Sequence, residues 1–126
     1  MVSMEIRIEL VILPVSDVDR ARDFYVDKIG FTLDHDHTVS DEVRFVQLTP
    51  PGSACSIAFG KGLTTAEPGT VKGLQAVVDD ADKVRAELVS RGAEVSEVED
   101  LAWGRFVQFD DPDGNHWALQ QIVRPS

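Results

Sequence analysis

The chain has 126 residues, of which 43% are hydrophobic and 27% charged, and its formal net charge is −10 at pH 7. This composition suits one globular domain with its own core rather than a disordered chain. The acidic charge disfavours nucleic acid and anionic membranes as partners, because both are themselves negatively charged.

No apolar run approaches the roughly 18–20 residues that cross a bilayer. The N-terminal residues show no secretory pattern, so we expect no targeting segment. Cys55 is the only cysteine, which excludes an intramolecular disulfide and a thiolate metal cluster. Together these features favour the cytoplasm.

The first half of the chain predicts a strand, a helix and three further strands. An apolar run at 8–15 is followed by Asp17, a residue type that caps helix N-termini. Apolar residues then recur at three- and four-residue spacing up to Ile29, and Gly30 is placed to end this amphipathic helix. Strand-like runs follow at about 31–37, 43–49 and 55–60.

The second half repeats this order. An apolar run at 74–78 precedes Asp80, a helix that Gly92 ends, and strand-like runs at about 93–98, 105–110 and 116–122. Two sequence matches indicate that the second half of the chain duplicates the first. Arg44-Phe45-Val46-Gln47 recurs as Arg105-Phe106-Val107-Gln108, and Asp17-Val18-Asp19-Arg20 matches Asp80-Ala81-Asp82-Lys83.

The duplication predicts one α+β domain, residues 1–126, built from two tandem β-α-β-β-β modules. Module one covers about 4–60 and module two about 72–123. Between them, the glycine-containing segment at about 61–71 is expected to be a linker.

Three features together resemble the vicinal oxygen chelate superfamily of glyoxalase I, extradiol dioxygenases, fosfomycin-resistance transferases and bleomycin-resistance proteins. They are the repeated unit, the opening Leu13-Pro14-Val15-Ser16-Asp17 with Phe24-Tyr25 and Gly30-Phe31, and the closing Phe109-Asp110-Asp111-Pro112-Asp113-Gly114-Asn115. The resemblance covers nearly the whole chain. It implies a curved, partly open mixed sheet around a cleft, with the helices on the convex side.

Metal-dependent members of that superfamily hold a cation with His, Glu or Gln at four matching strand positions. Counted from the shared landmarks, these positions carry Leu10, Ala58, Gly73 and Ala118. None of these side chains has a nitrogen, oxygen or thiolate donor, so we expect no metal and no cofactor. In the segment Asp34-His35-Asp36-His37, the two histidines would point to one face of a strand and could share a metal, but the segment is interpreted as a solvated strand end. The group Asp111, Asp113 and Asn115 is interpreted as turn chemistry.

Because side chains alternate between the two faces of a strand, the neighbours of these positions predict the lining of the cleft. Val46, Leu48, Val107 and Phe109 should face the helices, and Ile12 and Val77 should share the cleft face. A lining of apolar and aromatic side chains with a few amides is typical of small-molecule sites. The predicted ligand-binding residues are Leu10, Phe45, Gln47, Ser56, Ala58, Gln75, Trp103, Phe106, Gln108, His116, Ala118 and Gln120.

Candidate catalytic groups are few. His116 is the one candidate general base on the predicted cleft face. Cys55 has no motif around it, so we expect it to be buried, and Tyr25 is expected to belong to the core.

The leading hypothesis is a metal-free protein that binds and sequesters a hydrophobic or aromatic compound, as bleomycin-resistance-like relatives do. We therefore expect binding rather than catalysis. The resemblance also implies a homodimer with clefts shared between subunits. One alternative is an enzyme of the same fold, a lyase, isomerase, dioxygenase or thiol transferase that uses His116 or a non-standard metal site. Another is a dimeric scaffold that binds a partner and no small ligand.

Overall fold

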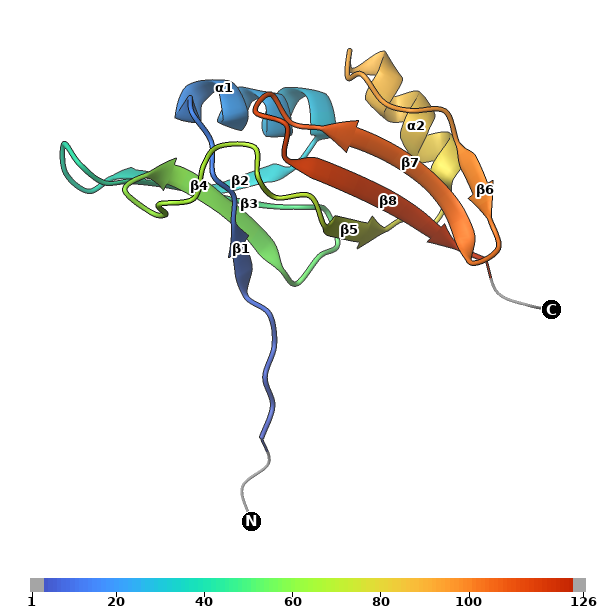
Figure 1. The fold of residues 1–126 in the computed structure, drawn as a ribbon, viewed down its shortest axis with the longest axis horizontal. Coiled ribbons are helices and arrows are strands. Elements are labelled where there is room, and N and C mark those ends of the chain that lie inside the picture. The colour runs from blue at the N-terminus through green and yellow to red at the C-terminus, as the bar shows by residue number, and fades with distance from the viewer. Residues whose placement is uncertain (1–3, 124–126) are drawn as a thin grey trace.

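The computed structural model describes residues 4–123 and consists of two modules side by side (Figure 1). Residues 1–3 and 124–126, which the predicted domain also includes, lie outside the described residues. The first module contains β1 (Leu10–Ile12), α1 (Val18–Asp23), the π-helix η1 (Phe24–Ile29), β2 (Thr32–Thr38), β3 (Arg44–Thr49) and β4 (Ser56–Lys61). The second contains β5 (Leu74–Val77), α2 (Ala81–Ser90), β6 (Glu99–Leu101), β7 (Gly104–Asp110) and β8 (His116–Ile122).

Each module forms one four-stranded mixed sheet, with strand orders β1-β4-β3-β2 and β5-β8-β7-β6. The first strand pairs in parallel with the last, and the remaining neighbours are antiparallel. α1 packs on β4, while α2 packs on β7 and β8. These observations confirm the α+β fold of two tandem β-α-β-β-β modules.

The helix boundaries follow from the capping residues. The side chain of Asp17 accepts a 3.0 Å hydrogen bond from the Arg20 amide, and that of Asp80 accepts one of 3.1 Å from the Lys83 amide. Both are N-caps, as predicted. Gly30 ends the first helical segment with a φ of 85°, a conformation that favours glycine. The sequence pattern predicts one α-helix up to Ile29, but its last six residues form a π-helix.

The prediction of a strand at 93–98 is wrong. This segment is irregular, and strand β6 begins only at Glu99. The Ser96 amide donates to the Gln108 carbonyl, and the Gln108 amide donates to Ser96 Oγ instead of to a backbone carbonyl. Because a serine side chain takes the place of a ladder partner there, regular pairing with β7 does not extend through this segment.

The core confirms the predicted alternation of the strands. Val46, Leu48, Val107 and Phe109 are all buried in a single cluster that both modules share. The cluster is joined by aromatic rings, with Trp117 of β8 5.5 Å from Phe31, measured between ring centroids. The helix-side faces of the two sheets thus pack on a common core, and their opposite faces point away from it.

Within residues 4–123, no helix is both long and apolar enough to cross a membrane.

Candidate functional site

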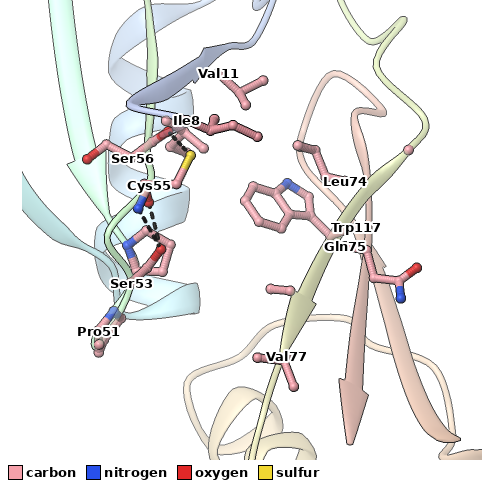
Figure 2. A pocket seen from close by; sticks show the side chains of 15 residues that line it. Ile8, Val11, Pro51, Ser53, Cys55, Ser56, Leu74, Gln75, Val77 and Trp117 are labelled. Carbon is pink, nitrogen blue, oxygen red and sulfur yellow. Dashed lines mark hydrogen bonds between the residues drawn. The ribbon is translucent and has the colours of Figure 1, made fainter. Parts of the chain in front are cut away.

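A pocket of about 580 Å³ lies between the two modules (Figure 2). Its size is within the range of small-molecule sites. Figure 2 shows Ile8 and Val11 reaching toward it from the first module, and Leu74 and Trp117 from the second. The lining consists of Ile8, Val11, Pro50, Pro51, Gly52, Ser53, Cys55, Ser56, Ile57, Gly73, Leu74, Gln75, Ala76, Val77 and Trp117.

This intermodule pocket overlaps the predicted lining only in part. Ser56, Gln75 and Val77 border it, but most of its apolar wall comes from helix-side residues. Cys55, which the sequence predicts to be buried, is only half-buried and borders the pocket.

The predicted residues, Ser56 and Gln75 included, form two groups on the sides of the two sheets that face away from the core. We call Leu10, Phe45, Gln47, Ser56 and Ala58 the first cleft face. Across the ladders of the first sheet, Leu10 lies opposite Ser56, and Ala58 opposite Gln47.

The second cleft face consists of Gln75, Phe106, Gln108, His116, Ala118 and Gln120, with Trp103 at its rim. Ala118 lies between Gln75 and Gln108, and Gln120 lies opposite Phe106. Trp103 is 62% exposed. Within residues 4–123, no strand pairing or hydrogen bond joins the two cleft faces. The structure therefore gathers the predicted residues into two groups rather than one.

The second cleft face carries two hydrogen-bonded polar groups. Gln75 Nε2 donates to Gln120 Oε1 over 2.6 Å, and Gln120 Nε2 donates to the Trp103 carbonyl over 3.0 Å. The ring of His116 lies between Asp110 and Gln108, with Nδ1 2.6 Å from Asp110 Oδ1 and Nε2 2.8 Å from Gln108 Oε1. These groups supply polar anchors on either side of the Ala118 methyl group.

The first cleft face also carries His35 and His37, which the sequence predicts on one strand face but not in the cleft lining. His35 lies opposite Gln47 and His37 opposite Phe45, so both imidazoles share this face. A β-bulge lies between Leu33 and His35, and such a bulge shifts the alternation of a strand by one residue. Nothing in the local sequence signals that shift.

The opposite side of strand β2 carries an ion-pair cluster. Asp36 accepts hydrogen bonds from Arg44 and Arg22, with distances of 2.8–3.0 Å. The bonds from Arg44 and then Arg22 lower the pKa of Asp36 to about 2. This cluster belongs to the helix side and is not part of either cleft face.

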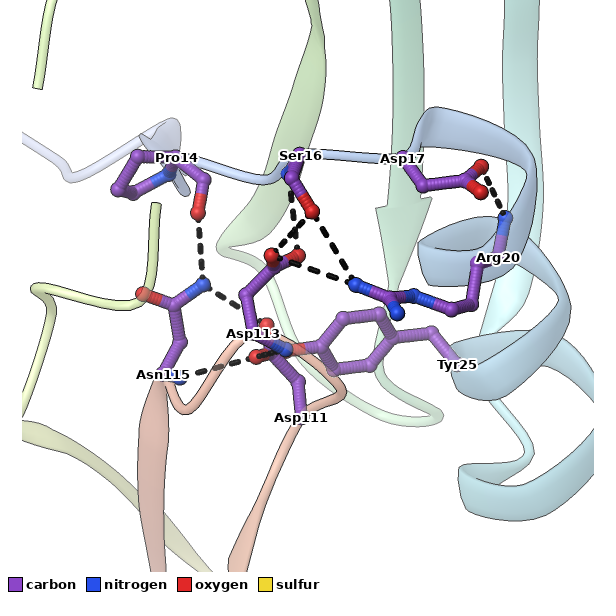
Figure 3. Close-up of polar contacts among 8 residues, drawn as sticks. All are labelled: Pro14, Ser16, Asp17, Arg20, Tyr25, Asp111, Asp113 and Asn115. Atoms are coloured by element: carbon purple, nitrogen blue, oxygen red, sulfur yellow. Dashed lines mark hydrogen bonds and ion pairs between the residues drawn. The ribbon is translucent and has the colours of Figure 1, made fainter. Parts of the chain in front are cut away.

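A buried polar network connects the two modules (Figure 3). Asp111 Oδ1 accepts hydrogen bonds from the backbone amides of Asp113 and Asn115, which confirms the predicted turn chemistry. Asn115 Nδ2 donates to the Pro14 carbonyl over 3.0 Å, and Ser16 Oγ donates to Asp113 over 2.6 Å. The β7–β8 turn is thereby fixed to the segment before α1.

Tyr25 lies at the centre of this network and is fully buried, as predicted for a core residue. Its hydroxyl donates to Asp111 Oδ2 and accepts from Trp117 Nε1, each over 2.9 Å. Burial, and secondarily the Asp111 carboxylate, raise the pKa of Tyr25. The phenol therefore stays protonated and holds the Trp117 wall of the intermodule pocket.

Comparison with known proteins identifies the fold. The family model of the Glyoxalase/Bleomycin resistance protein/Dioxygenase superfamily matches residues 7–119. The chain belongs to this superfamily.

Two solved structures of this superfamily fold are similar along their whole length. TnmS3, an antibiotic binding protein from Streptomyces sp. CB03234, is 37% identical, with 96% of this chain and 100% of that chain covered and a TM-score of 0.85. A superfamily member from Sphaerobacter thermophilus is 31% identical, with 94% and 98% covered and a TM-score of 0.80. The uncharacterized protein YetH of Bacillus subtilis is 28% identical over 112 residues, which cover 85% of this chain and 91% of YetH.

The residues present do not fit the metal of the superfamily's metal-dependent members. The four positions that the resemblance predicts for the metal ligands carry side chains without a donor atom, namely Leu10, Ala58, Gly73 and Ala118. Among the described residues, no group of three or more His, Cys, Asp or Glu side chains is arranged to hold an ion. We therefore derive no chemistry through a metal at these positions.

Proposed function

We propose that this protein binds a hydrophobic or aromatic small molecule without a metal and sequesters it, in the manner of an antibiotic-resistance protein. The observation that carries the proposal is the composition of the two cleft faces. The positions where a superfamily metal would be held have small or apolar side chains, and amide groups flank them. An apolar surface with a few polar anchors suits an organic ligand better than a cation. The likeness to TnmS3, described as an antibiotic binding protein, supports the same conclusion.

The ligand-binding residues in this proposal are those of the two cleft faces. Ala118, which is only partly buried, leaves room where a larger side chain would occupy the surface. Aromatic contact comes from Phe45, Phe106 and Trp103, because aromatic side chains pack favourably on flat ligands. Polar contact comes from the amides of Gln47, Gln75, Gln108 and Gln120, the hydroxyl of Ser56 and the imidazole of His116.

We further propose a homodimer that brings the first cleft face of one copy opposite the second cleft face of its partner. The segment before β1 runs away from both sheets (Figure 1), and its Met4, Ile6 and Ile8 side chains are 83%, 85% and 72% exposed. These residues continue the alternation of Leu10 on β1. On the other module, Val77 of the edge strand β5 is also exposed.

Exposed apolar side chains on unpaired edge strands favour association. A second copy would cover both edges at once, since β1 and β5 are edge strands of their respective sheets. Each cleft would then be lined by residues from two chains, which accounts for the separation of the two cleft faces within one chain.

A thermal-shift screen tests the proposed function. The purified protein would be heated with polycyclic aromatic natural products and, separately, with divalent zinc, nickel, iron and manganese. A ligand at 100 times its dissociation constant adds about 2.7 kcal/mol to the free energy of unfolding. We expect stabilisation by an aromatic compound that chromatography then recovers unchanged. Conversion of that compound to a product, or stabilisation only with a metal, would contradict the proposal.

The second candidate function is an enzyme in which His116 acts as a base. The short contact between His116 Nδ1 and Asp110 favours it, because a carboxylate orients an imidazole for proton transfer. Turnover of a bound compound that His116→Gln abolishes would support this function over sequestration.

A further inference from the structure

His116 makes hydrogen bonds with both of its ring nitrogens on the second cleft face. Asp110 Oδ1, 2.6 Å from Nδ1, belongs to a carboxylate and is an acceptor, so Nδ1 carries a hydrogen. Gln108 Oε1, 2.8 Å from Nε2, is also an acceptor. The ring is thus held between the Asp110 carboxylate and the Gln108 amide oxygen.

The amide of Gln108 is thereby oriented. Its oxygen is engaged by His116, and within residues 4–123 its Nε2 has no hydrogen-bond partner. Gln108 is half-buried and lies opposite Ala118 on the neighbouring strand. Because Ala118 has only a methyl group, the amide N–H groups of Gln108 remain accessible from the cleft side.

We propose that Gln108, positioned by the Asp110–His116 pair, donates a hydrogen bond to an oxygen acceptor of the ligand. The site would accordingly prefer aromatic ketones over aromatic hydrocarbons of the same shape. This inference rests on the proposed function, since it names the chemical class of ligand that the second cleft face selects.

Other charged groups at this end of the β7–β8 hairpin have partners of their own. Lys72 Nζ donates to the Gly114 carbonyl, Asp113 is held by Ser16 and Arg20, and Asp111 is held by Tyr25 and Asn115. Asp110 is the charged group in direct contact with the His116 ring.

A matched pair of probes tests the inference. 9-Fluorenone and fluorene share one shape, differ in a carbonyl oxygen, and do not titrate near neutral pH. Their dissociation constants would be measured by quenching of tryptophan fluorescence. We expect fluorenone to bind roughly two- to tenfold more tightly than fluorene, the value of one hydrogen bond. Equal dissociation constants would overturn the inference.

Three variants assign the effect. Gln108→Leu should remove the preference for fluorenone, and His116→Ala, which no longer holds the Gln108 amide oxygen, should weaken it. Glu67→Gln, at an exposed position outside both cleft faces, is the control and should leave the preference unchanged. A preference that survives Gln108→Leu would overturn the inference.

A measurement without ligand keeps this inference separate from the proposed function. The ¹⁵N and ¹H signals of the Gln108 side-chain amide should shift in His116→Ala, while those of Gln120 stay in place. If neither probe binds, the proposed function fails, and the amide signals still test whether His116 holds Gln108. Gln108 amide signals that His116→Ala leaves unchanged would overturn the inference by themselves.

Discussion

The hydroxyl of Tyr25 in the first module donates a 2.9 Å hydrogen bond to Oδ2 of Asp111 in the second. The same hydroxyl accepts from Trp117 Nε1, so a single phenol connects η1, the β7–β8 turn and strand β8. Because these groups are buried, each requires its partner. The relative position of the two modules, and hence of the two cleft faces, depends on this contact.

Replacing Tyr25 by Phe should lower the free energy of unfolding by about 1–3 kcal/mol, because the buried Trp117 N–H loses its acceptor. Urea unfolding followed by circular dichroism measures the change. Trp103→Phe, at an exposed position, is the control and should stay within about 0.5 kcal/mol of the unmodified protein. Equal stabilities of Tyr25→Phe and the control would show that the network does not join the modules energetically.

Two glycines with the same backbone conformation should differ in their tolerance of alanine. Gly52 has a φ of 80° and no atom within 4 Å of an added Cβ, so Gly52→Ala should cost about 1–2 kcal/mol of backbone strain alone. Gly69 has a φ of 79°, but its added Cβ would lie 2.0 Å from the carbonyl oxygen of Asp113. Gly69→Ala should cost clearly more stability than Gly52→Ala, and thermal unfolding of both variants measures the difference. Equal losses of stability would mean that the turn at Asp113 moves aside without cost.

The ion-pair cluster around Asp36 should make stability depend on pH in the acid range. The pKa of Asp36 is about 2 in the folded protein, below the value of about 3.9 for an unfolded chain. A lowered pKa in the folded state stabilises above the unfolded pKa, and that stabilisation is lost as the pH falls from about 4 toward about 2. Asp36→Asn should therefore be destabilising, on the order of 1 kcal/mol, near neutral pH.

The difference between Asp36→Asn and the unmodified protein should shrink through that acid range. Unfolding in urea at a series of pH values measures it. Asp27→Asn, which replaces an exposed carboxylate on η1, should show no comparable change. A difference that stays constant down to the lowest pH would argue against an ionised Asp36 as the stabilising group.

The proposed homodimer predicts a loss of association when the segment before β1 becomes charged. Ile6→Asp places a carboxylate where an exposed apolar side chain would be covered by the partner, so the variant should sediment as a monomer. Arg7, on the alternate side of the same extended segment, is paired with Glu5 at the surface. Arg7→Ala is therefore the matched control and should sediment as the unmodified protein does. A monomeric unmodified protein would contradict the proposed assembly.

Much of the fold follows from local patterns in the sequence. The alternation at Val46 and Leu48, and at Val107 and Phe109, predicts which face of each sheet is buried, because strand geometry repeats every two residues. Asp17 and Asp80 mark the helix starts since a carboxylate caps free amides. The duplication itself is visible in the repeated Arg-Phe-Val-Gln segment.

The arrangement of the site is harder to predict from the sequence than the fold is. The bulge before His35 moves two imidazoles onto the first cleft face, and no local sequence pattern marks it. The contact of Tyr25 with Trp117 joins residues far apart in the chain. This contact helps to set the relative position of the modules and therefore of the two cleft faces. Sequence patterns describe one strand at a time and do not predict such a position.

The central claim is that the cleft faces bind an aromatic compound without metal, and paired cleft-filling variants test it most directly. Ala118 lies on the second cleft face, whereas Ala76 borders the intermodule pocket. Binding of the best compound from the thermal-shift screen would be measured by calorimetry with a chelator present, and the compound analysed afterwards. We predict metal-independent binding of unchanged compound that Ala118→Phe weakens at least about tenfold, or about 1.4 kcal/mol, and Ala76→Phe leaves intact. Binding that requires a metal, or that only Ala76→Phe abolishes, would contradict it.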